Sequence, residues 1–256
     1  MNKKIIILFF ICLISLLLVL PINATDINNN NLTSHSDSYQ ITDEMSNDDI
    51  QMMFDTANDG DTFEFNSKEY NNISLVVDKK LNIVSSRNSV VHTSGAVNSK
   101  AEDLGIDKTF GFYFTSNSSG SILSGITIIS TLSDYGVIVD GSDNSKIINN
   151  VITGGKKAGM LVKNSDNVTV SFNSISKSAG DGLQLKDVGF SSIKNNTISH
   201  NGRSGIETSN INNNSIFSNI HIICNVKFKG TISSYMTSNF LFIHKHFSLV
   251  INCTKM

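Results

Sequence analysis

The stretch GVIV at 136–139 is followed by GMLV at 159–162, GLQL at 182–185 and GIET at 205–208, so one tetrapeptide pattern recurs with a 23-residue period. An asparagine follows each glycine at a constant separation, which gives a second column in the same register. Two columns with one spacing indicate a repeat protein, in which each unit buries its apolar side chains only by stacking on its neighbours. The two columns are Gly136, Gly159, Gly182 and Gly205, and Asn150, Asn173, Asn196 and Asn219.

The residues within each repeat predict short strands. The second and fourth positions of the tetrapeptides would point to one side of a strand, and the third position would point to the other. This third position changes along the chain from Ile138 and Leu161 to Gln184 and Glu207, so the outward column becomes polar. A column of β-branched residues at 147, 170, 193 and 216, together with turn residues such as those at 141–144, also favours strands.

A repeat of this length that contains only short strands and turns fits one coil of a parallel β-helix, whose coils stack about 4.8 Å apart. An inward asparagine in each coil can hydrogen-bond to the asparagines above and below it, which satisfies polar groups that are buried. The glycines are expected where the backbone needs a positive φ or a close contact between coils.

The repeat over residues 111–220 resembles the right-handed parallel β-helix of the pectate-lyase-like superfamily. The resemblance implies an all-β fold, a single right-handed parallel β-helix (solenoid). Apolar residues at helical spacing behind an N-cap residue at 47, ended by the turn at 58–60, predict a short N-terminal capping helix. Alternating segments at 60–65 and 70–77 are similar to the first coils of adhesin-like surface proteins of methane-producing archaea. We therefore expect residues 47–220 to form a β-helix with an N-terminal cap, and a helix beginning near residue 47 to cover its open end.

The N-terminus has the pattern of a secretory signal peptide over residues 1–24. A short basic start at 2–4 precedes an apolar run at 5–20 that only Ser15 interrupts, and Ala24 offers a small residue for cleavage. The alternative is an uncleaved membrane anchor, although the apolar run is shorter than a full span. The expected localisation is secreted, extracellular or at the cell surface, with membrane contact only through this segment if it is retained.

The composition and net charge of the chain limit the classes of partner that it is expected to bind. The 256-residue chain has a formal net charge of −2, which becomes −4 when the two lysines of the leading segment are removed. A mildly acidic product gives no reason to expect nucleic acid as a partner. Of the three cysteines, Cys224 and Cys253 follow the leading segment, and they form neither a disulfide framework nor a metal-ligand spacing. We expect a monomer without a cofactor.

Three segments depart from the repeat. Residues 25–46 are polar and lack a period, and we interpret them as a flexible leader. Residues 92–109 interrupt the rhythm and are expected to form an inserted surface loop or an irregular coil. The period predicts glycine at 228 and asparagine at 242, where the chain has Phe228 and Phe242. Residues 221–256 are therefore an irregular tail, either a dissimilar C-terminal cap or, as we favour, the out-of-frame end of a truncated copy.

The resemblance directs the search for chemistry to the outer face of the coils. Superfamily members that cleave acidic polysaccharides use clustered carboxylates there, with Ca²⁺ and a basic residue or as a close set of aspartates. In the columns that begin at 134, 140 and 143, only Asp143 and Asp166 stack as acids in neighbouring coils, which suggests a weak Ca²⁺ site. The structural alternative, which we favour, is that both are turn residues that bond their own backbone. Asp181 and Arg203 are candidate partners, but charged turn residues are expected to be solvated.

No catalytic residue is assigned from the sequence. The predicted function is a structural and adhesive β-helix module that binds extracellular glycans or neighbouring cell surfaces, without catalysis. The alternative is a polysaccharide lyase or glycoside hydrolase that acts on acidic glycans, because this architecture supports both kinds of protein.

Overall fold

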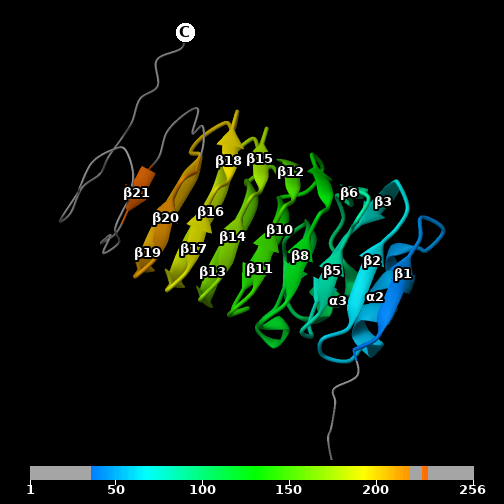
Figure 1. The fold of residues 1–256 in the computed structure, drawn as a ribbon. Coiled ribbons are helices and arrows are strands. Elements are labelled where there is room, and N and C mark those ends of the chain that lie inside the picture. Colours follow the sequence, from blue (N-terminus) through cyan, green and yellow to red (C-terminus); the bar gives the residue numbers. More distant parts are fainter. Residues whose placement is uncertain (1–35, 220–226, 230–256) are drawn as a thin grey trace, which may run out of the picture. The chain divides into compact units, whose positions relative to one another are not determined.

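The computed structural model describes residues 36–219 and 227–229, which form three parallel β-sheets wound as a right-handed β-helix (Figure 1). Each complete coil contributes one strand to each sheet, in the order sheet A, sheet B, sheet C. This confirms the predicted fold class. The proposed signal peptide lies outside the described residues, as does the tail except for one strand. Within the described residues, no helix is long and apolar enough to cross a membrane.

Sheet A has eight strands, one from each coil. They are β1 (Ser38–Ile41), β2 (Thr62–Phe65), β5 (Asn82–Val84), β8 (Ile122–Ser124), β11 (Lys146–Ile148), β14 (Thr169–Ser171), β17 (Ser192–Lys194) and β20 (Ser215–Phe217).

Sheets B and C form the other two sides of the coils. Sheet B contains β3 (Glu69–Ile73), β6 (Val90–Thr93), β9 (Thr127–Ser130), β12 (Val151–Gly154), β15 (Ser174–Ser176) and β18 (Thr197–Ser199). Sheet C contains β4 (Leu75–Val77), β7 (Phe110–Phe114), β10 (Tyr135–Asp140), β13 (Ala158–Asp166), β16 (Asp181–Gly189), β19 (Ile206–Asn212) and β21 (Lys227–Lys229). A short 3₁₀ helix, η1, spans Ser116–Ser118.

The register of sheet C follows the period of the sequence. Met160 of β13 pairs with Val137 of β10 and with Leu183 of β16, one coil to either side. Phe112 of β7 also pairs with Val137, although the coil that joins them is slightly longer than the repeats that follow, so its extra residues are accommodated between the strands. Because the later coils are equal in length, equivalent side chains stack directly and the aliphatic columns fill the interior.

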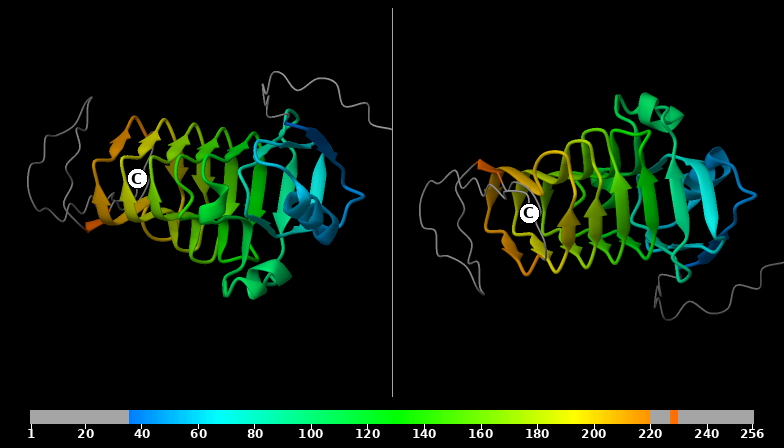
Figure 2. Two further views of the ribbon diagram at one scale, coloured as in Figure 1. Left: turned by 90° about the horizontal axis from the view of Figure 1, so that it is seen from below. Right: turned by 90° about the horizontal axis from the view of Figure 1, so that it is seen from above.

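The N-terminal end of the β-helix is covered by helix α2 (Asn47–Thr56), which follows β1 in the chain (Figure 2). Ser46 and Asp49 form a capping box that fixes the start of this helix. Ile50 and Phe54 are buried against the apolar interior. The strand β1 itself lies within the segment expected to be a flexible leader. It pairs with β2, so the regular fold begins earlier than predicted, because its backbone completes the edge of sheet A.

The segment expected to be a surface loop packs onto the outer face of sheet C. It contains the short helix α3 (Ser99–Asp103), which projects from the side of the coils in Figure 2. Ala101 is fully buried, and Val97 and Ile106 pack beside it. They form a second apolar cluster with outward side chains of the sheet, namely Val76, Phe110, Tyr113, Tyr135, Ile138, Ala158 and Leu161. The apolar part of the outward column is therefore covered by the chain itself.

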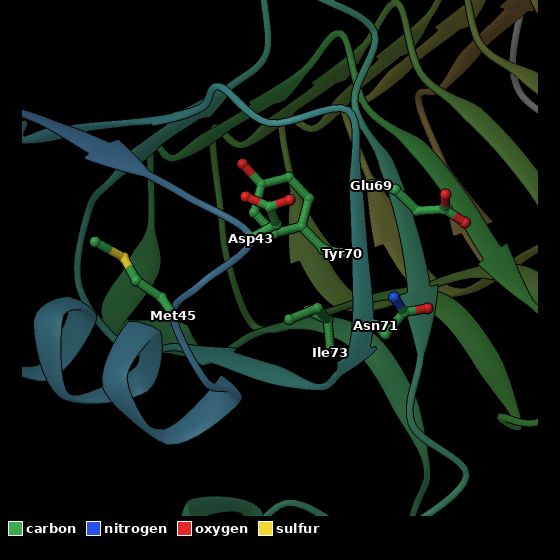
Figure 3. Close-up of a pocket in the computed structure, with 6 residues that line it drawn as sticks. All are labelled: Asp43, Met45, Glu69, Tyr70, Asn71 and Ile73. Carbon is green, nitrogen blue, oxygen red and sulfur yellow. The ribbon is translucent and has the colours of Figure 1, made fainter.

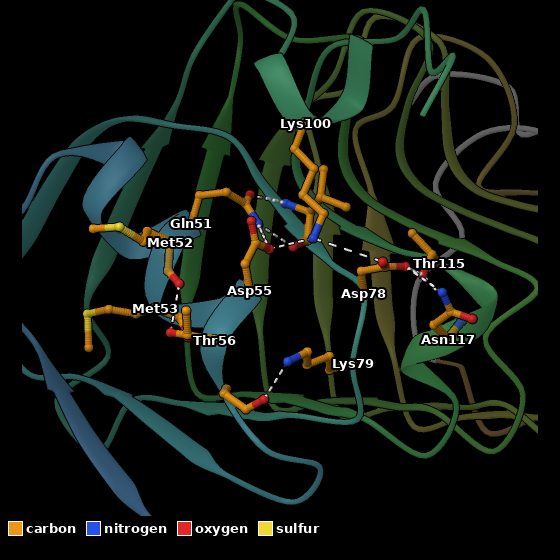
Figure 4. A network of polar contacts seen from close by, with 12 residues as sticks. Gln51, Met52, Met53, Asp55, Thr56, Asp78, Lys79, Lys100, Thr115 and Asn117 are labelled. Carbon is orange, nitrogen blue, oxygen red and sulfur yellow. Dashed lines mark hydrogen bonds and ion pairs between the residues drawn. The ribbon is translucent and has the colours of Figure 1, made fainter. Parts of the chain in front are cut away.

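Helix α2 also supplies hydrogen-bond partners for the backbone at the first edge of sheet C. Gln51 donates its Nε2 to the carbonyl of Val76 at 2.9 Å and accepts the Val76 N–H on Oε1 at 2.8 Å, as a neighbouring strand would. Lys100 of α3 pairs with Asp55 of α2, and its Nζ lies 4.0 Å from Asp78 Oδ2 (Figure 4). The first strand of sheet C thus has its backbone paired although no strand precedes it in the described part of the sheet.

The four asparagines at 150, 173, 196 and 219 form one continuous inward line. The Oδ1 of each later member accepts the backbone N–H of the one before it, as in Asn150 to Asn173 at 2.9 Å and Asn173 to Asn196 at 3.0 Å. The same oxygens accept from the preceding Nδ2 groups, and Asn173 Nδ2 also donates to the carbonyl of Ile147 at 2.7 Å. The file ends with Asn196 donating to Asn219. Each amide therefore satisfies two backbone groups of the preceding coil, an N–H and a carbonyl.

The repeated glycines are needed for close contact. Gly136, Gly159 and Gly182 are not among the residues with positive φ. A Cβ at Gly159 would lie 2.6 Å from Ile175 Cγ2 and 3.0 Å from the carbonyl oxygen of Gly182. The sequence left two explanations for these glycines, a positive φ and a close contact between coils. The close contact applies, because a side chain at this corner would overlap the isoleucine column of sheet B.

Replacing Asn173 by alanine should lower the free energy of unfolding by roughly 2–4 kcal/mol, because the Asn150 N–H and the Ile147 carbonyl would stay buried without partners. Urea unfolding followed by circular dichroism measures this change. Asn71→Ala is the matched control, since Asn71 is exposed and should tolerate the change. Equal effects of the two substitutions would contradict the role of the asparagine file.

Gly159→Ala should destabilise the fold by roughly 1–3 kcal/mol, the usual cost of overpacking, since its Cβ would overlap Ile175 Cγ2. Gly95→Ala is the comparison variant and should cost less, because the atoms nearest to its Cβ lie at 3.3 Å and need to move by only a few tenths of an ångström. Thermal unfolding of both variants gives the comparison, and an unchanged melting temperature for Gly159→Ala would remove the steric explanation.

Candidate functional site

The outer face of sheet C carries a polar group of side chains, here called the Asp181 cluster. Asp181 begins β16 and Gln184 follows in the same strand, while Arg203 precedes β19 and Glu207 lies within it. Gln184 and Glu207 are register partners in neighbouring strands. Tyr135 stands two coils before Asp181 in the same column, with the small Ala158 between them.

Asp181 is a buried carboxylate with three hydrogen-bond donors. Its side chain is 1% exposed, and its Oδ2 pairs with the guanidinium of Arg203 and accepts from Gln184 Nε2 at 2.7 Å. Its Oδ1 accepts the backbone N–H of Ser204 at 2.8 Å. The expectation that Asp181 is a solvated turn residue is wrong, because the residue opens a strand and the next coil covers it. Burial of the charge is tolerated because each oxygen has a partner.

Gln184 bridges the two carboxylates of the cluster. Its Nε2 lies 2.7 Å from Asp181 Oδ2 and 3.1 Å from Glu207 Oε2, so oxygens of both carboxylates bond to one nitrogen. Arg203 also approaches Glu207, at 3.9 Å. The Oε1 of Gln184 is buried and has no hydrogen-bond partner among the residues that the structure describes. The space between the carboxylates is therefore occupied by an amide and a guanidinium of the chain itself.

The electrostatics of the cluster keep Asp181 ionised. Burial alone raises the pKa of Asp181, but hydrogen bonds from Arg203, Gln184 and the Ser204 N–H outweigh it, and the pKa lies below its ordinary value. Burial raises the pKa of Tyr135, with smaller contributions from the charges of Asp134 and Asp181. A carboxyl with a lowered pKa holds its charge at neutral pH and is a poor proton donor.

Two further ion pairs on this face join neighbouring coils. Asp134 pairs with Lys157 at 3.3 Å, and Asp140 pairs with Lys163 at 2.8 Å. Asp140 also accepts the hydroxyl of Tyr113. Burial raises the pKa of Asp140, but hydrogen bonds from Lys163, Tyr113 and Asn164 bring it below its ordinary value. Each of these carboxylates is engaged with a cation from the following coil.

Of the candidate Ca²⁺ ligands, Asp143 lies in the turn between sheets C and A, and Asp166 is the last residue of β13. Asp143 Oδ1 accepts the backbone N–H of Asp166 at 2.7 Å. The carbonyl of Asp166 in turn accepts the N–H of Asn144 at 3.0 Å. This is a backbone-bonding use of a turn aspartate. No group of three or more metal-ligating side chains gathers within the described residues, and the Ca²⁺ site stays a prediction.

Two shallow hollows lie near the N-terminal coils, away from the Asp181 cluster. The first is lined by Asp43, Met45, Glu69, Tyr70, Asn71 and Ile73, as shown in Figure 3. The hydroxyl of Tyr70 already donates to the carbonyl of Ile41 at 2.6 Å, and Glu69 contacts His92 at 2.6 Å. The second hollow lies between α2 and α3 beside the Gln51 contacts of Figure 4. Both hollows are lined by segments at the N-terminal end of the β-helix, including the residues just before α2 and those of α2 and α3.

The sequence indicated only part of this site. The polar end of the outward column gave Gln184 and Glu207, and Asp181 and Arg203 were candidate partners, but the period did not indicate that the Asp181 carboxylate is buried. The missing signal was the bend before β19, which returns the Arg203 side chain toward the preceding coil.

The fold and the stacked polar face define a right-handed parallel β-helix protein. The family described as the right-handed β-helix region matches residues 110–252, more than half of the chain, and the chain belongs to this family. The match extends into the segment interpreted as an irregular tail. No curated protein matches the sequence.

Two solved structures are similar in fold. A predicted glycosyl hydrolase from Parabacteroides merdae ATCC 43184 has 14% identity and a TM-score of 0.48, over 69% of this chain and 96% of that one. Pectate lyase Pel9A has 12% identity and a TM-score of 0.46, over 76% of this chain and 57% of that one. Likeness at this level does not extend to activity.

The lowered pKa of Asp181 predicts a pH-dependent contribution to stability. The contribution should be complete above the ordinary aspartate pKa of about 3.9 and should be lost as the pH falls through the lower folded-state value. Asp181→Asn should therefore be less stable than the wild type at pH 7, and the difference should narrow toward pH 2. Thermal unfolding across this range measures it, with Asp103→Asn as an exposed control. A difference that stays constant with pH would argue against an ionised Asp181.

Proposed function

We propose that the chain is a secreted or cell-surface structural and adhesive module, a stack of β-coils that binds extracellular glycans or neighbouring cell surfaces without catalysis. The single observation that carries this proposal is the ionic pairing on sheet C. Asp134, Asp140 and Asp181 each pair with a cation from the following coil. These three carboxylates thus stabilise the contact between neighbouring coils.

The pKa directions support a structural use of these groups. A general acid that works near neutral pH needs a raised carboxyl pKa. The pKa values of Asp140 and Asp181 are both shifted in the opposite direction, since their hydrogen bonds favour the charged form. They suit permanent contacts better than proton transfer.

The alternative function, a polysaccharide lyase or glycoside hydrolase, draws on one observation. Oxygens of Asp181 and Glu207 lie 2.7 Å and 3.1 Å from the same nitrogen of Gln184, which brings the two carboxyl groups near each other. Retaining glycoside hydrolases hold their two carboxyl groups about 5–5.5 Å apart. However, Gln184 Nε2 bonds both oxygens, and a substrate would have to displace it. We therefore favour the non-catalytic function.

The proposal also includes export of the chain from the cell and its relation to adhesin-like proteins. Export would depend on the segment 1–24, and the similarity of the first coils to adhesin-like proteins of methane-producing archaea is consistent with a surface role. A stack of coils stabilised by buried amide contacts suits an exposed position, because each coil is held by its neighbours.

Incubation of the purified chain with polygalacturonate and Ca²⁺ should release neither unsaturated nor reducing ends, while the chain should be retained on the immobilised polysaccharide. Ultraviolet absorbance and a reducing-end assay measure the first result. A pectate lyase serves as the positive control. Cleavage that is abolished by Glu207→Gln would establish the enzymatic alternative instead.

A further inference from the structure

Two phenylalanines stand on the surface in an unfavourable backbone conformation. Phe172 is 57% exposed with φ of 58°, and Phe190 is 62% exposed with φ of 51°. The left-handed region is uncommon for residues other than glycine and strained for bulky ones. These side chains also gain little from burial, so neither packing nor backbone preference explains them.

The equivalent positions in other coils show what the backbone prefers. The column of Phe190 contains asparagine at 144, 167 and 213, and the column of Phe172 contains Asn149, Asn195 and Ser218, all with positive φ. Asparagine tolerates this conformation better than phenylalanine. In the Phe190 column, Asn167 Nδ2 donates to Asn144 Oδ1 at 2.6 Å, and Phe190 interrupts this row. The two phenylalanines thus replace residues that suit the corners better.

Both phenylalanines border the outer face of sheet A, where β14, β17 and β20 lie side by side (Figure 1). Phe172 follows β14, and Phe190 precedes β17 at the opposite end of the strands. A third ring, Phe217 of β20, is partly exposed, and Lys194 Nζ lies 6.0 Å from its centre. Hydroxyl side chains lie between the rings on outward positions of the same strands, namely Thr169, Ser192 and Ser215.

The strands of this face carry positive charge, whereas Asp143 and Asp166 lie at the corner that holds Phe190. The outward positions of β11, β14, β17 and β20 include Lys146 and Lys194 and no acidic residue. Neither lysine forms an ion pair within the described residues. This contrasts with sheet C, where Lys157, Lys163 and Arg203 are matched with carboxylates. An anionic ligand could therefore pair with Lys194 without breaking an existing ion pair.

The spacing of the rings suits an extended ligand. Phe172 and Phe217 are two coils apart, which is roughly 10 Å along the stack. Phe190 lies about 16 Å across the strands from the corner that holds Phe172, at about 3.3 Å per residue. The rings surround a flat surface of hydroxyl groups and a lysine, which is wide enough for several sugar rings.

We propose that this face of sheet A, bounded by Phe172, Phe190 and Phe217, binds an acidic glycan chain. Sugar rings would lie with their C–H groups against the phenylalanine rings, and a carboxylate or sulfate group would approach Lys194. A hydrocarbon surface would leave the hydroxyls of Thr169 and Ser192 without polar partners, whereas a glycan supplies them. This inference rests on the proposed adhesive function and assigns it to a specific surface.

The test replaces both phenylalanines by the residue found in their columns. The Phe172→Asn/Phe190→Asn variant should bind polygalacturonate at least roughly fivefold more weakly in isothermal titration calorimetry, since an aromatic contact contributes measurably. Its melting temperature should stay the same or rise, because asparagine suits the left-handed corners. Met52→Gln, which changes an exposed apolar side chain on α2, is the matched control and should bind as the wild type does.

The charge is tested separately. Lys194→Gln should weaken binding of polygalacturonate and reduce its sensitivity to NaCl, because screened attraction to this ammonium would be lost. Lys156→Gln, which changes an exposed lysine just before β13, should leave both unchanged. Dextran sulfate distinguishes sulfate from carboxylate as the anionic group, and a neutral glucan should bind more weakly than either.

The outcomes separate this inference from the proposed function. If the wild type binds acidic glycans and the double phenylalanine variant binds equally well, the assignment to sheet A is wrong and the adhesive function stands. If the wild type binds no glycan, this inference is overturned together with the glycan-binding form of the proposed function. The chain could instead bind anionic lipid vesicles and not polysaccharide, with this binding lost in the double variant. That result would overturn the glycan as the ligand and identify a membrane surface in its place.

Discussion

The stacking of buried asparagine amides from coil to coil is the constraint on which the rest of the structure depends. Each Oδ1 accepts a backbone N–H from the neighbouring coil, as between Asn173 and Asn150, and each Nδ2 returns a hydrogen bond to a strand carbonyl. These bonds form only if the asparagine corner of each coil stacks on the same corner of its neighbour, which the later coils achieve with equal lengths. Equal coils in turn place the aliphatic side chains in continuous columns, so the polar file and the apolar interior enforce the same register.

A stack of parallel strands leaves unpaired backbone at its first coil, and this protein solves that problem with side chains. Gln51 provides both a donor and an acceptor to Val76, as an additional strand would. Helix α2 covers the apolar interior with Ile50 and Phe54, and the segment around α3 covers the apolar part of the outer face of sheet C. The irregular segments are therefore concentrated where the regular repeat would expose an edge or an apolar surface.

The outer faces of sheets A and C differ in how their charges are used. On sheet C, buried or half-buried aspartates pair with cations of the next coil, and this matching supports cohesion between coils. On sheet A, Lys146 and Lys194 lack such partners within the described residues, and two phenylalanines occupy strained corners. Cohesion and recognition can therefore be assigned to different sides of one coil, because side chains on separate sheets do not compete for the same contacts.

The sequence alone determined the period, the strand character of each repeat, the inward asparagines and the presence of a cap, because these features recur at fixed intervals or follow local preferences such as helix capping. It suggested but could not choose between two reasons for the glycines, since only coordinates show Ile175 beside Gly159. The tertiary structure decided that β1 belongs to sheet A, that the segment around α3 packs on sheet C, and that Asp181 is buried against Arg203. These contacts join residues from different columns or irregular segments, and a repeat determines only which residues share a column, so the three-dimensional path of the bends had to settle them.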